Sequence, residues 1–362
     1  MIEGRGGTRP VGGPSGVEID ALLREAVAAE ASDLHLSAEA PPMLRVQGEL
    51  IRQGEQVLSA ATAERALADL APAGVLARLA AVGEVDFSYS LPGVGRFRVA
   101  AYRQRGSVCL AIRPIPSRIP DLDELGAPPI AAGWARQRSG LVLIAGRAGA
   151  GKSTTLAAMV EAINRERSAH VIALEDPVEY LHRHKRSLVH QREIGVDSAD
   201  FPQALRAAMR QNPDVIVVGE VREAETAASV LLAAETGHLV LATVRQPDCA
   251  RSLDFLVELF PTAQQSQVAW QLAGVLEGAM AQVLLPRRDG AGRAAVFEVL
   301  VGTPAVRTLI RDGKRPQLPA LLRTGVRHGM RTLDQAWREL VARGVLDGDE
   351  PPPFPLPPSA GG

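Results

Sequence analysis

The sequence has few of the residues that mark secreted, zinc-binding or membrane-spanning proteins. Its 362 residues include two cysteines, Cys109 and Cys249, which lie far apart and form no C-x-x-C pair. This usage argues against a disulfide framework and a zinc module, and with no recognisable signal peptide it predicts a cytoplasmic location. No stretch approaches the ~18 apolar residues of a membrane-spanning helix. We therefore expect no direct membrane insertion, and membrane association only through protein partners.

An excess of charge of one sign is also missing. The chain has 40 Lys and Arg against 41 Asp and Glu, a formal net charge of -1, and no basic block. This balance argues against nucleic acid as the main partner, because nucleic-acid-binding domains carry basic patches. Hydrophobic residues make up 46% of the chain, so a largely disordered protein is excluded. The length predicts about two domains.

A phosphate-binding loop is predicted by one stretch that fits the P-loop pattern G-x-x-x-x-G-K-[ST]: Gly146-Arg147-Ala148-Gly149-Ala150-Gly151-Lys152-Ser153-Thr154. A short apolar run precedes it, as in a buried parallel strand, and apolar residues at helical spacing follow it. The alternative is a glycine-rich turn with an accidental Lys-Ser, which the flanking strand and helix disfavour. Lys152 is expected to reach the β- and γ-phosphates and Ser153 to hold Mg²⁺. We predict that the protein binds a nucleoside triphosphate.

Composition and periodicity divide the chain into five parts. Residues 1–16, rich in Gly, Pro and Arg, and the Pro-rich tail 348–362 are expected to be disordered. Between them we expect an α+β domain over 17–115, a stiff Pro-containing linker over 116–126, and an α/β domain over 127–347. The fold class is therefore α/β, with a smaller α+β domain in front.

Each domain has its own pattern of strands. The first domain is expected to contain an antiparallel meander, with strands at residues 31–37, 43–51, 86–91, 95–105 and 107–115. In the second domain, short apolar runs alternate with helical stretches, which is typical of a parallel sheet. Its expected strands are residues 141–145, 170–174, 215–218 and 238–243, with helices that include 201–211 and 223–235. The last third is expected to be mostly helical, with one strand at 294–301.

Carboxylates follow two of the predicted parallel strands. Glu175 and Asp176 follow the strand at 170–174, and Glu220 follows the strand at 215–218. Side chains at the carboxyl ends of such strands point into the crevice where ligands bind. One carboxylate is expected to support the metal and another to orient or deprotonate water. The alternative, an acid that caps a helix, is favoured only for Glu179.

These motifs resemble those of the type IV pilus retraction (twitching motility, PilT-like) ATPases of the secretion ATPase superfamily. The resemblance spans about residues 17–346. Besides the P-loop, it is carried by Ala31-Ser32-Asp33-Leu34-His35-Leu36-Ser37, Pro41-Pro42-Met43-Leu44-Arg45-Val46, Gly95-Arg96-Phe97-Arg98-Val99, Glu175-Asp176-Pro177-Val178-Glu179, Asn212-Pro213-Asp214-Val215-Ile216-Val217-Val218-Gly219-Glu220-Val221-Arg222, Ala234-Glu235-Thr236-Gly237-His238-Leu239 and Ala305-Val306-Arg307-Thr308-Leu309-Ile310-Arg311.

The resemblance implies an ATPase that forms a homo-hexamer, each subunit having a PAS-like N-terminal domain and a RecA-like ATPase domain. ATP and Mg²⁺ would be its cofactors. An inner-membrane pilus platform protein and a paralogous pilus ATPase would be its partners, at the cytoplasmic side of the inner membrane. The resemblance assigns water activation to Glu175 and Mg²⁺ support to Glu220. It assigns phosphate contacts to Arg98, Arg113 and His238.

The chain departs from the family in two places. Arg245 stands where the family has a second histidine, and Phe255 replaces an arginine of the following helix. Arg245 is expected either to reach the γ-phosphate or to pair with Glu175 or Glu220, and the second outcome is favoured. Two other functions stay open: a regulatory or structural partner that binds ATP but hydrolyses it weakly, and a RecA-like nucleic-acid motor.

Overall fold

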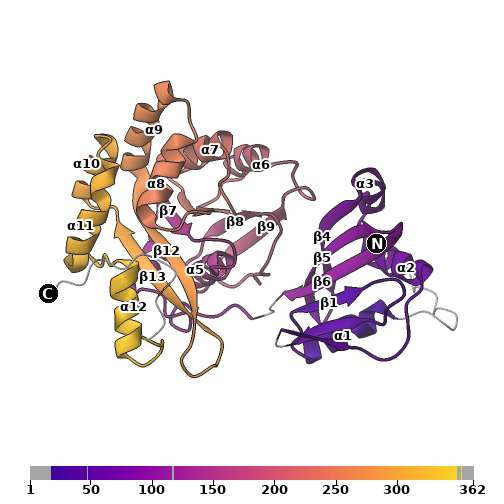
Figure 1. Cartoon of the computed structure of the whole chain (residues 1–362). Coiled ribbons are helices and arrows are strands. Elements are labelled where there is room, and N and C mark those ends of the chain that lie inside the picture. The colour runs from indigo at the N-terminus through magenta and orange to yellow at the C-terminus, as the bar shows by residue number, and fades with distance from the viewer. Residues whose placement is uncertain (1–17, 47, 116–117, 349–351, 353–362) are drawn as a thin grey trace. The chain divides into compact units, whose positions relative to one another are not determined.

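The chain, described here by a computed structural model, divides at residue 117 into two compact units (Figure 1). The structure describes residues 18–46, 48–115, 118–348 and 352. The segment 1–16 and nearly all of the tail 348–362, both expected to be disordered, lie outside the described residues. Each unit has its own sheet and hydrophobic core. In the described part of the chain, no helix is both long enough and apolar enough to cross a bilayer.

The first unit is a mixed α and β fold built on one six-stranded sheet, in the order β3-β2-β1-β6-β5-β4, with every neighbouring pair antiparallel. Its elements are α1 (Ile19–Ala28), β1 (Asp33–Leu36), β2 (Met43–Val46), β3 (Glu49–Arg52), α2 (Ala60–Leu70), α3 (Val75–Val82), β4 (Glu84–Leu91), β5 (Gly95–Gln104) and β6 (Ser107–Ile115). The prediction of a single strand at 43–51 is wrong. This segment is a hairpin of β2 and β3, because the chain turns at Gly48, whose φ is +90°.

The second unit is built on a seven-stranded sheet in the order β13-β12-β7-β11-β10-β8-β9. Only the β12–β13 pair is antiparallel. Its strands are β7 (Gly140–Ala145), β8 (His170–Glu175), β9 (Leu188–Glu193), β10 (Val215–Val218), β11 (Leu239–Val244), β12 (Leu276–Pro286) and β13 (Arg293–Val301). Its α-helices are α4 (Ile130–Ala135), α5 (Lys152–Glu166), α6 (Phe201–Ala208), α7 (Ala224–Glu235), α8 (Cys249–Glu258), α9 (Thr262–Val275), α10 (Pro304–Arg311), α11 (Leu318–Thr324) and α12 (Leu333–Ala342).

Helices cover both faces of this sheet, so its central strands are buried throughout. Along β7, Leu141 and Leu143 belong to the core under α6 to α11, whereas Val142 and Ile144 belong to the core under α4 and α5. Alternate side chains of one strand therefore enter opposite cores, which explains why β7 appears in the sequence as a continuous apolar run.

Two strands, β9 and β12, differ from the expectation. The last third is not mostly helical with a single strand, because β12 begins at Leu276, directly after α9 ends at Val275. Gly274 and Gly278 flank this junction, but no residue separates the helix from the strand. In the segment expected as a linker, Leu122 is buried in the core of the second unit and Asp121 pairs with Arg165 at 2.5 Å.

Candidate nucleotide-binding site

Parallel register brings the ends of four strands into one row. The strands lie in the order β7-β11-β10-β8, and their last residues lie within two residues of one another in the register. The P-loop follows β7, Arg245 follows β11, Glu220 lies just past β10, and Glu175 ends β8. The predicted phosphate loop and both predicted carboxylates therefore lie along one edge of the sheet, where open parallel sheets bind ligands.

The P-loop turns sharply between β7 and α5, and its glycines make this possible. Gly146, Gly149 and Gly151 have φ values of +155°, +75° and +87°, which disfavour residues with a side chain. Lys152, the first residue of α5, turns back into the loop. Its Nζ donates to the carbonyl oxygens of Gly146 at 2.8 Å and Arg147 at 3.1 Å. A bound phosphate would therefore replace these two carbonyls as the acceptor of the Lys152 ammonium.

Lys152 interacts electrostatically with charged residues that follow the neighbouring strands. Burial lowers the pKa of Lys152 below its ordinary value of 10.5. Glu220 and Glu179 act against this shift, and Arg245 adds to it. The ammonium, both carboxylates and Arg245 thus form one interacting group.

Glu220 lies between two arginines. It is 8% exposed, and Arg222 Nε donates to its Oε2 at 2.6 Å. Arg245 Nε lies 2.5 Å from Glu220 Oε1. This contact is an ion pair without hydrogen-bond geometry, since Oε1 accepts no hydrogen bond from the described residues. The expectation that Arg245 pairs with a carboxylate is confirmed, and the carboxylate is Glu220.

Ser153 and Glu220 are the residues that would hold Mg²⁺. Ser153 is half-buried in the first turn of α5, at the end of the P-loop. Mg²⁺ prefers oxygen ligands and is commonly held by a hydroxyl or one carboxylate together with phosphate oxygens. Glu220 Oε1 is buried and has no hydrogen-bond donor among the described residues, so the donor set fits this cation.

Glu175 and Thr154 are held by contacts from the segment between β8 and β9. Gln191 on β9 donates from Nε2 to Glu175 Oε1 at 3.0 Å and to the carbonyl of Tyr180 at 2.6 Å. The Tyr180 hydroxyl lies 2.9 Å from Thr154 Oγ1 on α5. The P-loop helix and the end of β8 are therefore connected through Tyr180.

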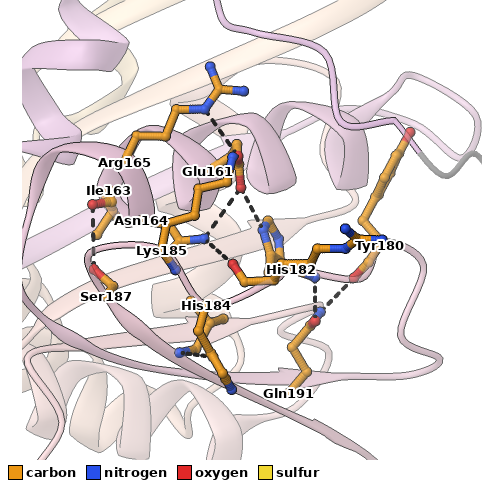
Figure 2. A network of polar contacts seen from close by, with 12 residues as sticks. Glu161, Ile163, Asn164, Arg165, Tyr180, His182, His184, Lys185, Ser187 and Gln191 are labelled. Carbon is orange, nitrogen blue, oxygen red and sulfur yellow. Dashed lines mark hydrogen bonds and ion pairs between the residues drawn. The ribbon is translucent and has the colours of Figure 1, made fainter.

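A buried carboxylate, Glu161 on α5, anchors this segment (Figure 2). Lys185 and Arg165 pair with Glu161, the latter at 3.1 Å, and His182 Nδ1 lies 3.4 Å from it. Burial favours the neutral form of Glu161, but hydrogen bonds from Lys185 and His182 outweigh it and lower the pKa below its ordinary value of 4.5. Burial lowers the pKa of His182, so its ring is neutral near pH 7.

The remaining predicted site residues belong to other parts of the two units. His238 precedes β11, at the end of the sheet opposite to the P-loop, and its carbonyl accepts from Gly140 N at 3.0 Å. At about 3.3 Å per strand residue, this is roughly 20 Å from the loop, so the structure does not bring His238 to the site. Arg98 and Arg113 face each other across β5 and β6 of the first unit. Arg98 pairs with Asp86 at 3.3 Å, and Arg113 with Asp33 at 2.9 Å.

Three residues contact the site without having been predicted there. Arg222 lies within a family motif, but its pairing with Glu220 depends on the loop after β10. Gln191 and Gln282 come from β9 and β12, the two strands that the sequence pattern does not predict. A lone glutamine inside the apolar run of β12 is the signal that could have identified Gln282.

Comparisons with known proteins agree with one another. The family model described as "Type II/IV secretion system protein" matches residues 13–290. The type IV pilus retraction ATPase PilT of Pseudomonas aeruginosa is 39% identical over 330 residues, which cover 91% of this chain and 96% of PilT. The type IV pilus ATPase PilU of the same organism is also 39% identical over 330 residues, covering 91% of this chain and 86% of PilU.

A solved structure extends the likeness to the fold. The crystal structure of the pilus retraction motor PilT with bound ADP matches this chain with a TM-score of 0.86 and 38% identity. The match covers 93% of this chain and 98% of PilT.

The Glu161 cluster generates a prediction about stability and pH. Glu161→Gln removes the charge that Lys185 and Arg165 surround, and we expect the free energy of unfolding to fall by about 1–3 kcal/mol at pH 7. The folded-state pKa of Glu161 is depressed, so its stabilisation is present above the ordinary pKa and is lost as pH falls through the folded pKa. The difference between variant and wild type should therefore shrink between pH 5 and pH 3 in denaturant unfolding.

Glu166→Gln is the matched control, because Glu166 lies on the same helix but pairs with Arg136 at the surface. That pair should contribute less than about 1 kcal/mol. Equal losses for the two variants would contradict an anchoring role for Glu161.

Proposed function

Because the chain belongs to the type II/IV secretion ATPase family, on its PilT-like branch, we propose that it is a motor that couples ATP hydrolysis to retraction of a type IV pilus. The observation that carries this proposal is the row of strand ends that places Glu175 and Glu220 along the same edge as the P-loop. The full-length likeness to PilT with bound ADP supports a nucleotide at this edge.

Different residues at these strand ends bind the phosphates, hold Mg²⁺ and activate the attacking water. The backbone N–H groups of the P-loop and the Lys152 ammonium bind the phosphates, and Ser153 and Glu220 hold Mg²⁺. Bound Mg²⁺ supplies charge neutralisation at the phosphate oxygens. Glu175 orients the attacking water and accepts its proton, and Gln191 restricts the rotation of this carboxylate through the hydrogen bond to Oε1.

The assembled motor is a homo-hexamer of subunits with a PAS-like first domain and a RecA-like second domain. It works in the cytoplasm against an inner-membrane pilus platform protein, with a paralogous pilus ATPase as a further partner. Arg98 and Arg113 reach the phosphates of the assembled motor. Arg98 and Arg113 are paired in the β5–β6 register. Their ion pairs with Asp86 and Asp33 offset the repulsion between the two arginines.

Turnover is slower than in members with a histidine in place of Arg245. Arg245 pairs with Glu220, the carboxylate that must also support Mg²⁺, so the cation and the arginine compete for one oxygen. This competition favours, as a second candidate function, a subunit that binds ATP firmly and hydrolyses it weakly beside an active paralogue. The rate of phosphate release from the purified hexamer distinguishes the two functions.

The test of the main proposal separates binding from chemistry. Lys152→Ala should weaken Mg-ATP binding and abolish turnover, because no other ammonium lies in the loop. Glu175→Gln should bind Mg-ATP within about threefold of wild type but lower kcat by about 10²–10⁴, since it removes only the base. Titration calorimetry and phosphate release measure the two effects. Near wild-type kcat in Lys152→Ala would show that the P-loop is not the site of hydrolysis.

The arginine pair of the first unit is tested in the full chain. Arg98→Ala and Arg113→Ala should each lower kcat by at least tenfold, because arginines that stabilise phosphoryl transfer contribute up to ~10³–10⁵. Arg103→Ala is the matched control, since Arg103 lies on the same strand and donates to the Gly106 carbonyl at 3.3 Å. Equal kcat for all three variants would exclude the pair from the working site.

The competition at Glu220 predicts a gain in rate. Arg245→His should raise kcat about two- to fivefold without tightening ATP binding, because it removes an ion pair whose arginine is exposed, worth up to about 1 kcal/mol. Arg251→His serves as control, since Arg251 pairs only with Asp248 at the surface of α8. A fall in kcat for Arg245→His would show instead that Arg245 has become part of the catalytic site.

A further inference from the structure

Gln282 on β12 contacts the P-loop from the neighbouring strand. Its side chain is buried at 1% exposure, and its Nε2 donates to the carbonyl oxygen of Ala150 at 2.6 Å. The loop packs closely around it. A Cβ at Gly151 would lie 3.0 Å from Gln282 Nε2, and a Cβ at Gly146 would lie 2.9 Å from the Gln282 carbonyl oxygen. Both loop ends therefore lie against this one residue.

The orientation of the amide follows from its surroundings. With the two ends exchanged, Oε1 would face the Ala150 oxygen, and two acceptors would repel each other. The nitrogen therefore faces the loop. Gln282 Oε1 then accepts no hydrogen bond from any described residue. A buried acceptor without a donor costs free energy, so an apolar residue of the same size would serve packing better than glutamine does.

The hydrogen bond to Ala150 determines where the next N–H points. Among the described residues, only the Asp176–Pro177 peptide is cis, so the Ala150–Gly151 peptide is planar and trans. Its carbonyl and the Gly151 N–H point in opposite directions. Because Gln282 on β12 holds the carbonyl, the Gly151 N–H points away from β12.

We propose that Gln282 is a positioning residue of the nucleotide site, which holds the Ala150–Gly151 peptide so that the Gly151 N–H donates to a phosphate of the nucleotide. This inference rests on the proposed function, since it requires that the P-loop binds a nucleotide. Rotation of the peptide would turn the Ala150 carbonyl toward the phosphate and replace an attraction by a repulsion. Gln282 prevents this rotation without touching the ligand.

The test compares nucleotide affinity with stability in the full chain. Gln282→Met keeps the size of the side chain but cannot donate, and it should weaken Mg-ADP binding about ten- to hundredfold, the contribution of one hydrogen bond to a charged group. Its Tm should stay within a few degrees of wild type, because the unpaired Oε1 is removed together with the Ala150 contact. Gln282→Glu should bind Mg-ADP more weakly still, since a carboxylate repels both the Ala150 carbonyl and the phosphates.

Gln271→Met is the matched control, because Gln271 lies on the surface of α9 and donates to Glu235 at 3.0 Å. Its Mg-ADP affinity should equal that of wild type. If Gln282→Met does not fold, Gln282→Asn, whose shorter amide does not reach Ala150, takes its place.

Calorimetry distinguishes failure of the proposed function from failure of the positioning role of Gln282. If wild type does not bind Mg-ADP, the proposed function fails. If wild type binds and the Gln282 variants bind within twofold of it, only the positioning role is overturned, whatever their Tm.

Discussion

Parallel pairing among β7, β11, β10 and β8 is the constraint on which the candidate site depends. The four strands end within two residues of the same level of the sheet, so the residues that follow them lie near one another although they are far apart in sequence. A shift of one residue in any pair would turn the following carboxylate or arginine toward the opposite face. The continuous apolar runs in these strands do not oppose such a shift by polarity, because both faces of the sheet are buried, so the register depends on how the side chains pack in the two cores.

Charge balance is the second constraint on this edge. Lys152, Arg222 and Arg245 lie among Glu220, Glu179 and Asp176, and each carboxylate lowers the free energy of a neighbouring cation. An incoming nucleotide adds negative charge to a nearly neutral group. The arginine at position 245 adds a full positive charge that neutral histidine lacks at pH 7. Tight ligand binding and a restrained Glu220 are thus two effects of the same substitution.

Much of this site follows from local pattern. The P-loop and the strands before Glu175 and Glu220 appear as short motifs, and the row they form follows from the rule that parallel strands end together. That Arg245 pairs with Glu175 or Glu220 also follows from charge, and the structure shows that the partner is Glu220. The position of His238 was not predicted. It precedes β11 and therefore lies at the end of the sheet opposite to the P-loop. Gln191 and Gln282 escape prediction because β12 follows α9 with no residue between them, although Gly274 and Gly278 flank the junction, and because β9 is short and partly polar.

The contact between Gln282 and the P-loop has a consequence for synthesis on the ribosome. Ala150 and Gln282 are 132 residues apart in the chain. At about 5–20 residues per second, the P-loop emerges roughly 7–26 seconds before the strand that completes it. Until β11 and then β12 emerge, β7 lacks its neighbours in the sheet, and its unpaired apolar strand is open to other nascent chains. The delay makes the nucleotide-binding loop a point at which chaperones would have to protect the growing chain.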